Sequence, residues 1–149
     1  MSIFSRLTKL FRRTRGEPAT LQVDVSAERF VYVMIPEDIG PLDRGAKYED
    51  PLEAQLSKSG LGEITGGGSQ LGEKRPDGTS AIAFCGIDVD VNELEPALAL
   101  LRQALPTLGV PDGTELHYTR GGARLLDAFA GGRWTLGQHR EMLHPGFGV

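Results

Sequence analysis

The stretch that decides the fold is residues 81–91, Ala-Ile-Ala-Phe-Cys-Gly-Ile-Asp-Val-Asp-Val. Every second residue from Ala81 to Val91 is apolar, which is the pattern of a β-strand with one buried face. The next four residues, Asn92-Glu93-Leu94-Glu95, form a capping box in which Asn92 caps a helix. Pro106 marks the expected end of the regular helix, whose apolar stripe is Leu94, Ala97, Leu98, Leu101, Leu105 and Leu108.

Working outward from this unit, similar signals place four further elements. Residues 30–35, Phe-Val-Tyr-Val-Met-Ile, are a continuous apolar run typical of a central strand. Asp50-Pro51-Leu52-Glu53 predicts a helix start, with Gly60 at the helix end. We expect a short strand at 61–65, a hairpin connection at 69–79 and an alternating strand at 114–119. The order strand, helix, strand, strand, helix, strand predicts an α+β fold, a ferredoxin-like two-layer sandwich.

The chain divides into three parts by composition. Residues 1–17 are a basic leader. Residues 18–119 contain the predicted sandwich, which begins with a weak strand at 21–25. Residues 120–149 are an extension rich in apolar residues, which we expect to pack on the domain. Residues 2–13 predict an amphipathic helix that either docks on its own domain or lies on a membrane surface. The residues that would contact the membrane are Ile3, Phe4, Leu7, Leu10 and Phe11.

The phase of the strand at 81–91 has two interpretations. Without a bulge, Cys85 and its alternate neighbours lie under the helices, and Ile82 and Phe84 point to the other face. With a bulge at Gly86, Ile82 and Phe84 are buried instead. We prefer the first, which requires a cover for Ile82 and Phe84. Part of residues 120–149 crossing that face, or a homodimer interface, would supply it.

Four ionisable residues share the other face in the preferred phase. They are Asp88 and Asp90 on one strand and Glu115 and His117 on another. A solvated face is the plain explanation, because antiparallel sheets often expose one side. The alternative is an acidic docking surface for a basic protein partner. Glu115 and His117 are two residues apart on a strand, so they would form an acid–base pair only with the help of a third element.

The glycine-rich run suggests a second binding hypothesis, an anion or small-ligand site made by Thr65, Gly66, Gly67, Gly68 and Ser69. The run does not match the specific phosphate-loop templates. Thr65 stands where a third glycine is needed, and the predicted helix precedes the glycines instead of following them. A bulge or loop at the end of a strand is the simpler explanation.

Composition and charge narrow the function classes. The chain has 149 residues, of which 40% are hydrophobic and 20 are glycine, as expected for one folded domain with many turns. The net charge of −4 is unevenly distributed along the chain. The first fifteen residues carry five basic side chains and no acidic one, whereas the remaining residues carry eleven basic and twenty acidic side chains, a net charge of −9. This negative charge on the residues after the leader disfavours binding to nucleic acid and favours binding to basic partners.

Chemistry-bearing motifs are sparse. The spacing of His139 and His144 does not fit a metal helix, and Cys85 lacks a basic neighbour that would activate it. We therefore predict no catalytic residues, no metal and no cofactor. We favour a non-enzymatic role, with a small-ligand or anion-binding protein or enzyme that uses Gly66–Gly68 as the alternative. We predict a cytoplasmic location, because the sequence has a single cysteine, no secretory signal and no apolar span. Peripheral membrane contact through residues 2–13 is an alternative. The leading hypothesis is a regulatory or inhibitory protein-binding module, for example an immunity-type inhibitor, that uses the acidic face or the C-terminal tail.

Overall fold

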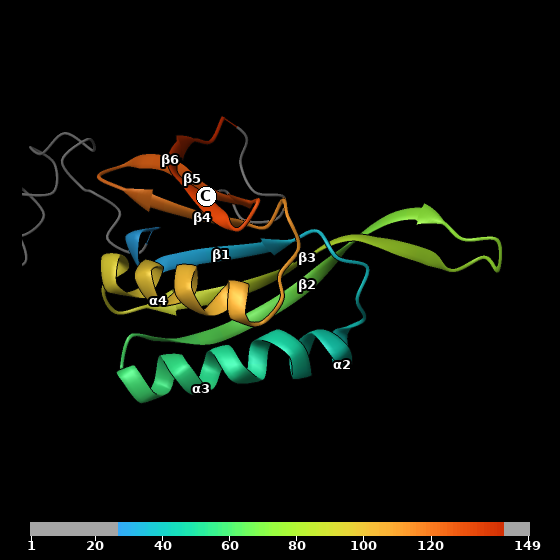
Figure 1. Ribbon diagram of the computed structural model, residues 1–149, viewed down its shortest axis with the longest axis horizontal. Coiled ribbons are helices and arrows are strands. Elements are labelled where there is room, and N and C mark those ends of the chain that lie inside the picture. Colours follow the sequence, from blue (N-terminus) through green and yellow to red (C-terminus); the bar gives the residue numbers. More distant parts are fainter. Residues whose placement is uncertain (1–26, 142–149) are drawn as a thin grey trace, which may run out of the picture.

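The computed structural model describes residues 27–141, which form a six-stranded antiparallel sheet with helices on one face (Figure 1). The elements are η2 (Ala27–Arg29), β1 (Phe30–Ile35), α2 (Pro41–Arg44), η3 (Gly45–Glu49), α3 (Asp50–Ser59), β2 (Gly62–Lys74), β3 (Ser80–Val91), α4 (Leu94–Thr107), β4 (Glu115–Arg120), β5 (Ala123–Ala130) and β6 (Arg133–His139). The order across the sheet is β2-β3-β1-β4-β5-β6. The α+β class is confirmed.

The sheet is larger than the four strands that we predicted. Strands β5 and β6 come from the C-terminal extension, and the glycine pairs 121–122 and 131–132, all with positive φ, make the tight turns that precede them. Leu125 and Phe129 belong to the core, so these strands extend the sheet sideways. The expectation that this segment crosses the sheet to cover Ile82 and Phe84 is therefore wrong for residues 123–139. The leader and the strand predicted at 21–25 lie outside the described residues.

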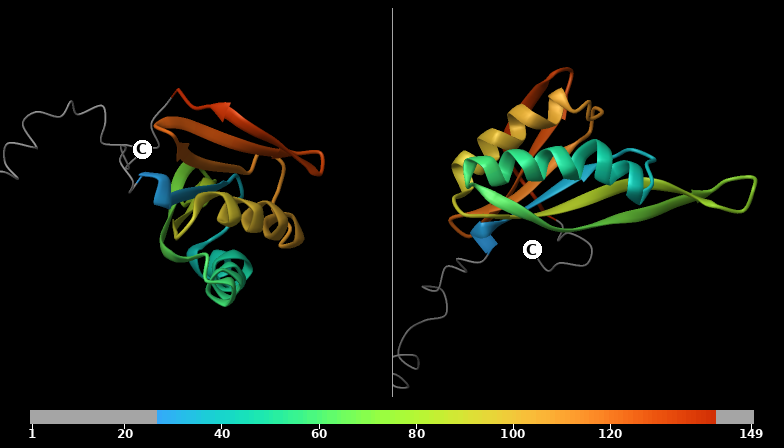
Figure 2. Two further views of the ribbon diagram at one scale, coloured as in Figure 1. Left: turned by 90° about the vertical axis from the view of Figure 1, so that its left-hand side faces the viewer. Right: turned by 90° about the horizontal axis from the view of Figure 1, so that it is seen from below.

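Strands β1, β3 and β4 supply the centre of the core under the helices (Figure 2). Strand β1 pairs with β3 in a continuous register through Met34 and Gly86, so Gly86 is not a bulge in this pairing. The preferred phase of β3 is thus confirmed from Cys85 to Val91, whereas Ala83 is exposed on the part of β3 that projects beyond the helices. Glu115 and His117 likewise alternate with two core residues of β4. The core residues of these strands are Val31, Val33, Ile35, Cys85, Ile87, Val89, Val91, Leu116 and Tyr118.

Both predicted capping boxes are wrong. The chain is already helical from Pro41, so Asp50 continues a helix and does not cap one. The Glu53 carboxylate instead accepts the Ile64 backbone N–H at 2.6 Å. Asn92 donates to the Gly60 carbonyl at 2.7 Å and ties the start of α4 to the end of α3. Helix α4 also runs one residue past Pro106, to Thr107, whereas Gly60 ends α3 with a positive φ as predicted.

Strand β2 continues through the glycine run where we expected a loop. It pairs with β3 from Gly62 to Lys74, with register shifts between Ile64 and Gly66 and on either side of Leu71. The outer half of this hairpin projects beyond the helices as a two-stranded arm (Figure 1). Asp38 holds the arm to the β1–α2 loop, because its carboxylate accepts the Ile82 N–H at 2.9 Å and pairs with Arg75.

A buried carboxylate joins the two added strands to helix α4. Asp127 has no exposed surface, and it accepts hydrogen bonds from Arg102 at 2.7 Å and from the Tyr118 hydroxyl at 2.6 Å. The Gly137 N–H donates to the same carboxylate at 2.9 Å. The Trp134 indole in turn donates to the Arg102 carbonyl at 2.8 Å. Helix α4 and strands β4, β5 and β6 therefore share one polar network.

Tyr32 makes the closest approach on the face away from the helices. A Cβ atom at Gly86 would overlap the Tyr32 ring, whereas a Cβ at Gly68, the partner of Gly86 on β2, meets nothing within 4 Å. We expect Gly86→Ala to lower the free energy of unfolding by about 1–3 kcal/mol through overpacking. Gly68→Ala is the matched control and should be neutral or slightly stabilising. Urea denaturation measures both; equal effects would contradict this account.

One buried and one exposed ion pair allow a test of how burial changes the contribution of an ion pair to stability. Asp127→Ala should cost about 3–5 kcal/mol, because it leaves Arg102 and the Tyr118 hydroxyl without their acceptor. Glu95→Ala breaks the exposed pair with Arg120 and should cost less than about 1 kcal/mol. Thermal or urea unfolding compares the variants. A small loss for Asp127→Ala would show that the network does not hold β5 and β6.

Candidate functional site

The side of the sheet away from both helices, here called the open face, carries all four ionisable residues that we predicted there. In the strand register His117 lies opposite Tyr32, and Tyr32 lies opposite Asp88. Asp90 lies two residues after Asp88 on β3, and Glu115 lies two residues before His117 on β4, so both share this face. The structure brings the four to one side, while their role in binding stays a prediction.

Tyr32 divides this face into two parts. Its side chain lies on Gly86, and its ring centroid is 5.7 Å from that of His117. The residue is only 5% exposed although it faces away from the helices. Burial, and secondarily the Asp88 carboxylate, raise the pKa of Tyr32 to about 12. The hydroxyl therefore stays protonated at neutral pH.

On one side of Tyr32 lies an acidic strip, which we define as Glu63, Asp88 and Asp90. Glu63 lies directly opposite Asp90 in the β2–β3 register, and Asp88 precedes Asp90 by two residues. None of the ion pairs within residues 27–141 includes a member of the strip. Burial, followed by repulsion from Asp90, raises the pKa of Asp88. The strip is a concentration of negative charge without a described counter-ion.

On the other side of Tyr32, Glu115 and His117 bind each other. The His117 Nε2 and Glu115 Oε1 atoms are 3.0 Å apart, so the two side chains bridge the spacing of two residues along the strand. The ring of Tyr32 on β1 also lies beside His117, and a role of this pair in acid–base chemistry stays a prediction. Burial and the nearby Arg124 lower the pKa of Arg140, and Glu115 opposes that shift. Glu115 thus has a hydrogen-bonded His117 and a nearby Arg140 guanidinium, whereas none of the ion pairs within residues 27–141 includes the acidic strip.

The glycine run is filled by the protein's own side chains. The Asp88 carboxylate lies against Gly66, and the guanidinium of Arg44 and the carboxylate of Glu49 lie against Gly67. Arg44 is 8% exposed and donates to the Gly68 carbonyl at 3.1 Å and to the Ser69 hydroxyl at 3.2 Å. It also pairs with Glu49 at 2.7 Å. Residues 66–69 are thus paired strand, with Thr65 at the register shift, and they lie beside two carboxylates and one guanidinium; ligand binding by residues 65–69 stays a prediction.

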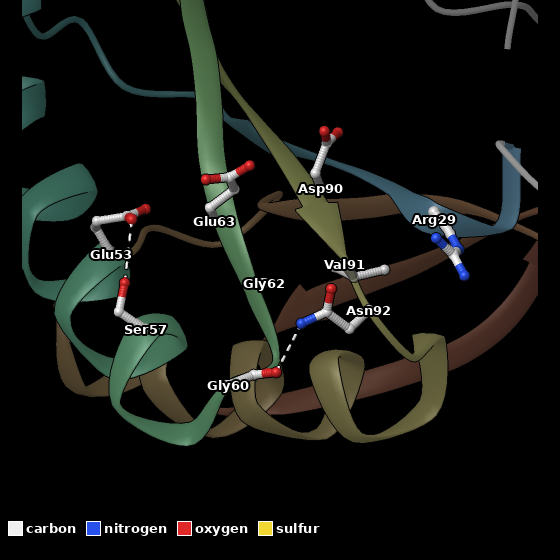
Figure 3. A pocket seen from close by; sticks show the side chains of 9 residues that line it. All are labelled: Arg29, Glu53, Ser57, Gly60, Gly62, Glu63, Asp90, Val91 and Asn92. Carbon is white, nitrogen blue, oxygen red and sulfur yellow. Dashed lines mark hydrogen bonds between the residues drawn. The ribbon is translucent and has the colours of Figure 1, made fainter.

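A shallow hollow of about 670 Å³ adjoins the acidic strip at the start of β2. Glu63 and Asp90 lie along one side of it, and Glu53 comes from α3 (Figure 3). Glu53 accepts from the Ser57 hydroxyl at 3.2 Å and from the Ile64 N–H, so its orientation is fixed. Arg29 lines the end of the hollow beyond Asp90, away from Glu53. The hollow therefore extends the acidic surface around the end of the sheet.

The other predicted sites divide between the core and undescribed segments. Cys85 is fully buried, and burial raises the pKa of its thiol to about 11, as expected for a core residue and not for a nucleophile. Residues 27–141 contain no cluster of His, Cys, Asp and Glu arranged to hold a metal, and none of their helices is long and apolar enough to cross a bilayer. The proposed membrane contacts Ile3, Phe4, Leu7, Leu10 and Phe11, and His144, lie outside the described residues.

Comparison with known proteins adds no functional assignment. Neither protein-family models, nor curated proteins, nor solved structures gave a match to this chain.

Two residues of this face were missed by sequence analysis. Glu63 joins the acidic strip because it lies opposite Asp90, and Tyr32 forms the centre because its neighbour Gly86 leaves room for the ring. The alternation within 61–65 could have placed Glu63 on the open face if the hairpin register had been known. Tyr32 was hidden in a continuous apolar run, which does not reveal which residues face each side.

The neighbours of Asp88 in the acidic strip lead to a prediction about the pKa of its carboxyl group. Asp90→Asn should lower the pKa of Asp88 but leave it above the ordinary value of 3.8, because burial is the larger cause. Since the folded state holds this proton more tightly than the unfolded state, Asp88 favours folding below that value, and this contribution falls as the pH rises through the raised pKa. Carbon-detected NMR titration of the carboxyl groups measures the shift. An Asp88 pKa at or below 3.8 in the unmodified chain would contradict this arrangement.

Proposed function

We propose that this protein is a regulatory or inhibitory binding module that docks a basic protein on the acidic strip. The observation that carries the proposal is the direct opposition of Glu63 and Asp90 beside Asp88, with no cation paired to them among residues 27–141. Like charges directly opposite each other on a sheet destabilise the fold. A partner that brings Lys or Arg side chains relieves this repulsion on binding.

The open face also offers apolar surface beside the charge. Met34, Ile82 and Phe84 are half-buried there, and Gly86 with the Tyr32 ring separates them from the acidic strip. Protein interfaces commonly combine an apolar centre with a charged rim, and the charges mainly set the association rate and the choice of partner. This combination supports a protein ligand more than a small metabolite. An immunity-type inhibitor of a basic toxin remains one example of such a module.

We also infer that residues 30–120 are a ferredoxin-like unit to which β5 and β6 were added. The support is the order β2-β3-β1-β4 within the sheet, together with the alternation of strands and helices along the chain. This fold accommodates many functions and assigns none. Its relevance here is that the helices occupy one face and leave the other for a partner.

Charge reversal tests the proposed docking. The double variant Asp88→Lys/Asp90→Lys should abolish binding of a Lys/Arg-rich peptide probe, which in the unmodified full chain should shift the amide resonances of residues 63, 88 and 90 in NMR spectra. The binding should weaken steeply as salt is added, because the attraction is between exposed charges.

The matched control is Asp43→Lys/Asp50→Lys, which makes the same change of charge at exposed positions of the helical layer. It should retain at least half of the affinity. Equal loss in both double variants would mean that the probe senses only net charge. Shifts on the helical layer instead of the strip would also refute the proposal.

A further inference from the structure

The open face continues outward along the β2–β3 hairpin, beyond the point where β1 ends. The last pair between β1 and β3 is Ile35 with Cys85, and from Phe84 outward the hairpin projects as the two-stranded arm, residues 70–84 (Figure 1). Phe84 lies four residues from Asp88 on β3, so the alternation of the strand places both on the open face. The arm and the acidic strip therefore belong to one continuous surface.

The charges on this surface are placed symmetrically about Phe84. Three facing pairs of the β2–β3 register are four residues apart on both strands; they are Gly66 with Asp88, Gln70 with Phe84, and Lys74 with Ser80. Because the spacing is equal on the two strands, the register shifts on either side of Leu71 cancel, and Lys74 lies on the same face as Phe84. Phe84 is thus the midpoint between Asp88 and Lys74, each about 13 Å away along the strands.

Lys74 is available for a contact with an anionic group. It is exposed, and none of the ion pairs within residues 27–141 includes it. Its neighbour Arg75 is already paired with Asp38. Glu73, the residue before it, has the other phase by the alternation of β2. The arm therefore presents one ammonium group on the face whose other end carries the acidic strip.

The middle of the surface is apolar and open. Ile82 and Phe84 are half-buried on the arm, and Met34 is half-buried on the neighbouring strand β1. On β2 a Cβ atom at Gly68 meets nothing within 4 Å, so there is space beside these side chains. Apolar groups in this situation are stabilised when another apolar surface removes them from water.

A second copy of the chain has the groups that match this surface. Two copies that face each other across a two-fold axis at Phe84 have antiparallel equivalent strands, which brings the two apolar middles together. The same operation brings Lys74 of each copy to the acidic strip of the other. We propose that two copies of this chain associate through their open faces in this way, as a symmetric dimer. The dimer does not depend on the proposed function, and a basic partner would compete with it for the acidic strip.

The size of the contact sets its expected strength. From Lys74 to Asp88 the surface runs about 26 Å along strands that are about 4.8 Å apart. A contact of these dimensions buries less than the roughly 1,600 Å² of a standard protein interface. We therefore expect a weak dimer, whose population rises with the concentration of the protein.

Mixing two charge-reversed chains tests the dimer. Full chains with Lys74→Glu, or with Asp88→Lys/Asp90→Lys, should each sediment as monomers, because like charges then meet at both ends of the contact. In the mixture both ends pair opposite charges again. A heterodimer should therefore form about tenfold more tightly than either variant associates with itself. Sedimentation velocity up to millimolar concentration measures all three samples, and misfolding of one variant cannot produce the gain.

Two matched controls separate this contact from general effects. Lys58→Glu makes the same charge change at an exposed position of α3, and this chain should self-associate like the unmodified one. Phe84→Ala should weaken the dimer about tenfold, because the side chain is lost from both copies at the axis. Leu136→Ala, at an exposed position of β6, should leave it unchanged.

Four outcomes would overturn the dimer. They are an unmodified chain that stays monomeric at millimolar concentration, a mixture that associates no more tightly than its components, equal effects of Lys58→Glu and Lys74→Glu, and equal effects of Phe84→Ala and Leu136→Ala.

The dimer and the proposed function can fail separately. Lys74→Glu leaves the acidic strip intact, so the Lys/Arg-rich peptide should still shift the amide resonances of residues 63, 88 and 90 in that chain. Absence of these shifts together with a heterodimer in the mixture would refute the proposed function alone. Shifts without a heterodimer would refute the dimer alone.

Discussion

A carboxylate without exposed surface holds the C-terminal half of the sheet to the rest of the molecule. Asp127 lies on the helix-facing side of β5, where an uncompensated charge would be very costly. Arg102, the Tyr118 hydroxyl and the Gly137 N–H supply its hydrogen bonds, and they come from α4, β4 and β6. Each of these elements is therefore required for the others to be stable at this position. The open face has its full width because β5 and β6 are fixed by this network.

Glycines permit the close approaches on the other half of the sheet. Gly67 leaves room for Arg44, which buries its guanidinium between η3 and β2, and Gly66 leaves room for the Asp88 carboxylate. Gly86 does the same for the Tyr32 ring. In all three cases a side chain of the protein itself occupies the space that a Cβ atom would fill. The glycine excess therefore reflects packing within strands as well as turns.

Sequence patterns predicted the elements whose signals are local and missed those that depend on distant partners. The strand at 30–35 followed from a continuous apolar run, and the strand at 81–91 with its phase followed from apolar alternation. The capping boxes failed because Glu53 and Asn92 bond to residues of other elements, Ile64 and Gly60, which no local pattern reveals. Strand β2 was cut short because glycine is a poor strand former, and pairing with β3 overrides that preference. Four members of the open face were predicted, while Glu63 and Tyr32 needed the register.

The two faces of the sheet impose opposite requirements on the chain. The helix-facing side is satisfied internally, since its apolar residues form one cluster and Asp127 has its donors. The open face combines half-buried apolar residues with three carboxylates that have no described cation partner, so its apolar and charged parts call for different occupants. Its apolar part is stabilised by burial against another surface, whereas its carboxylates are stabilised by cationic neighbours.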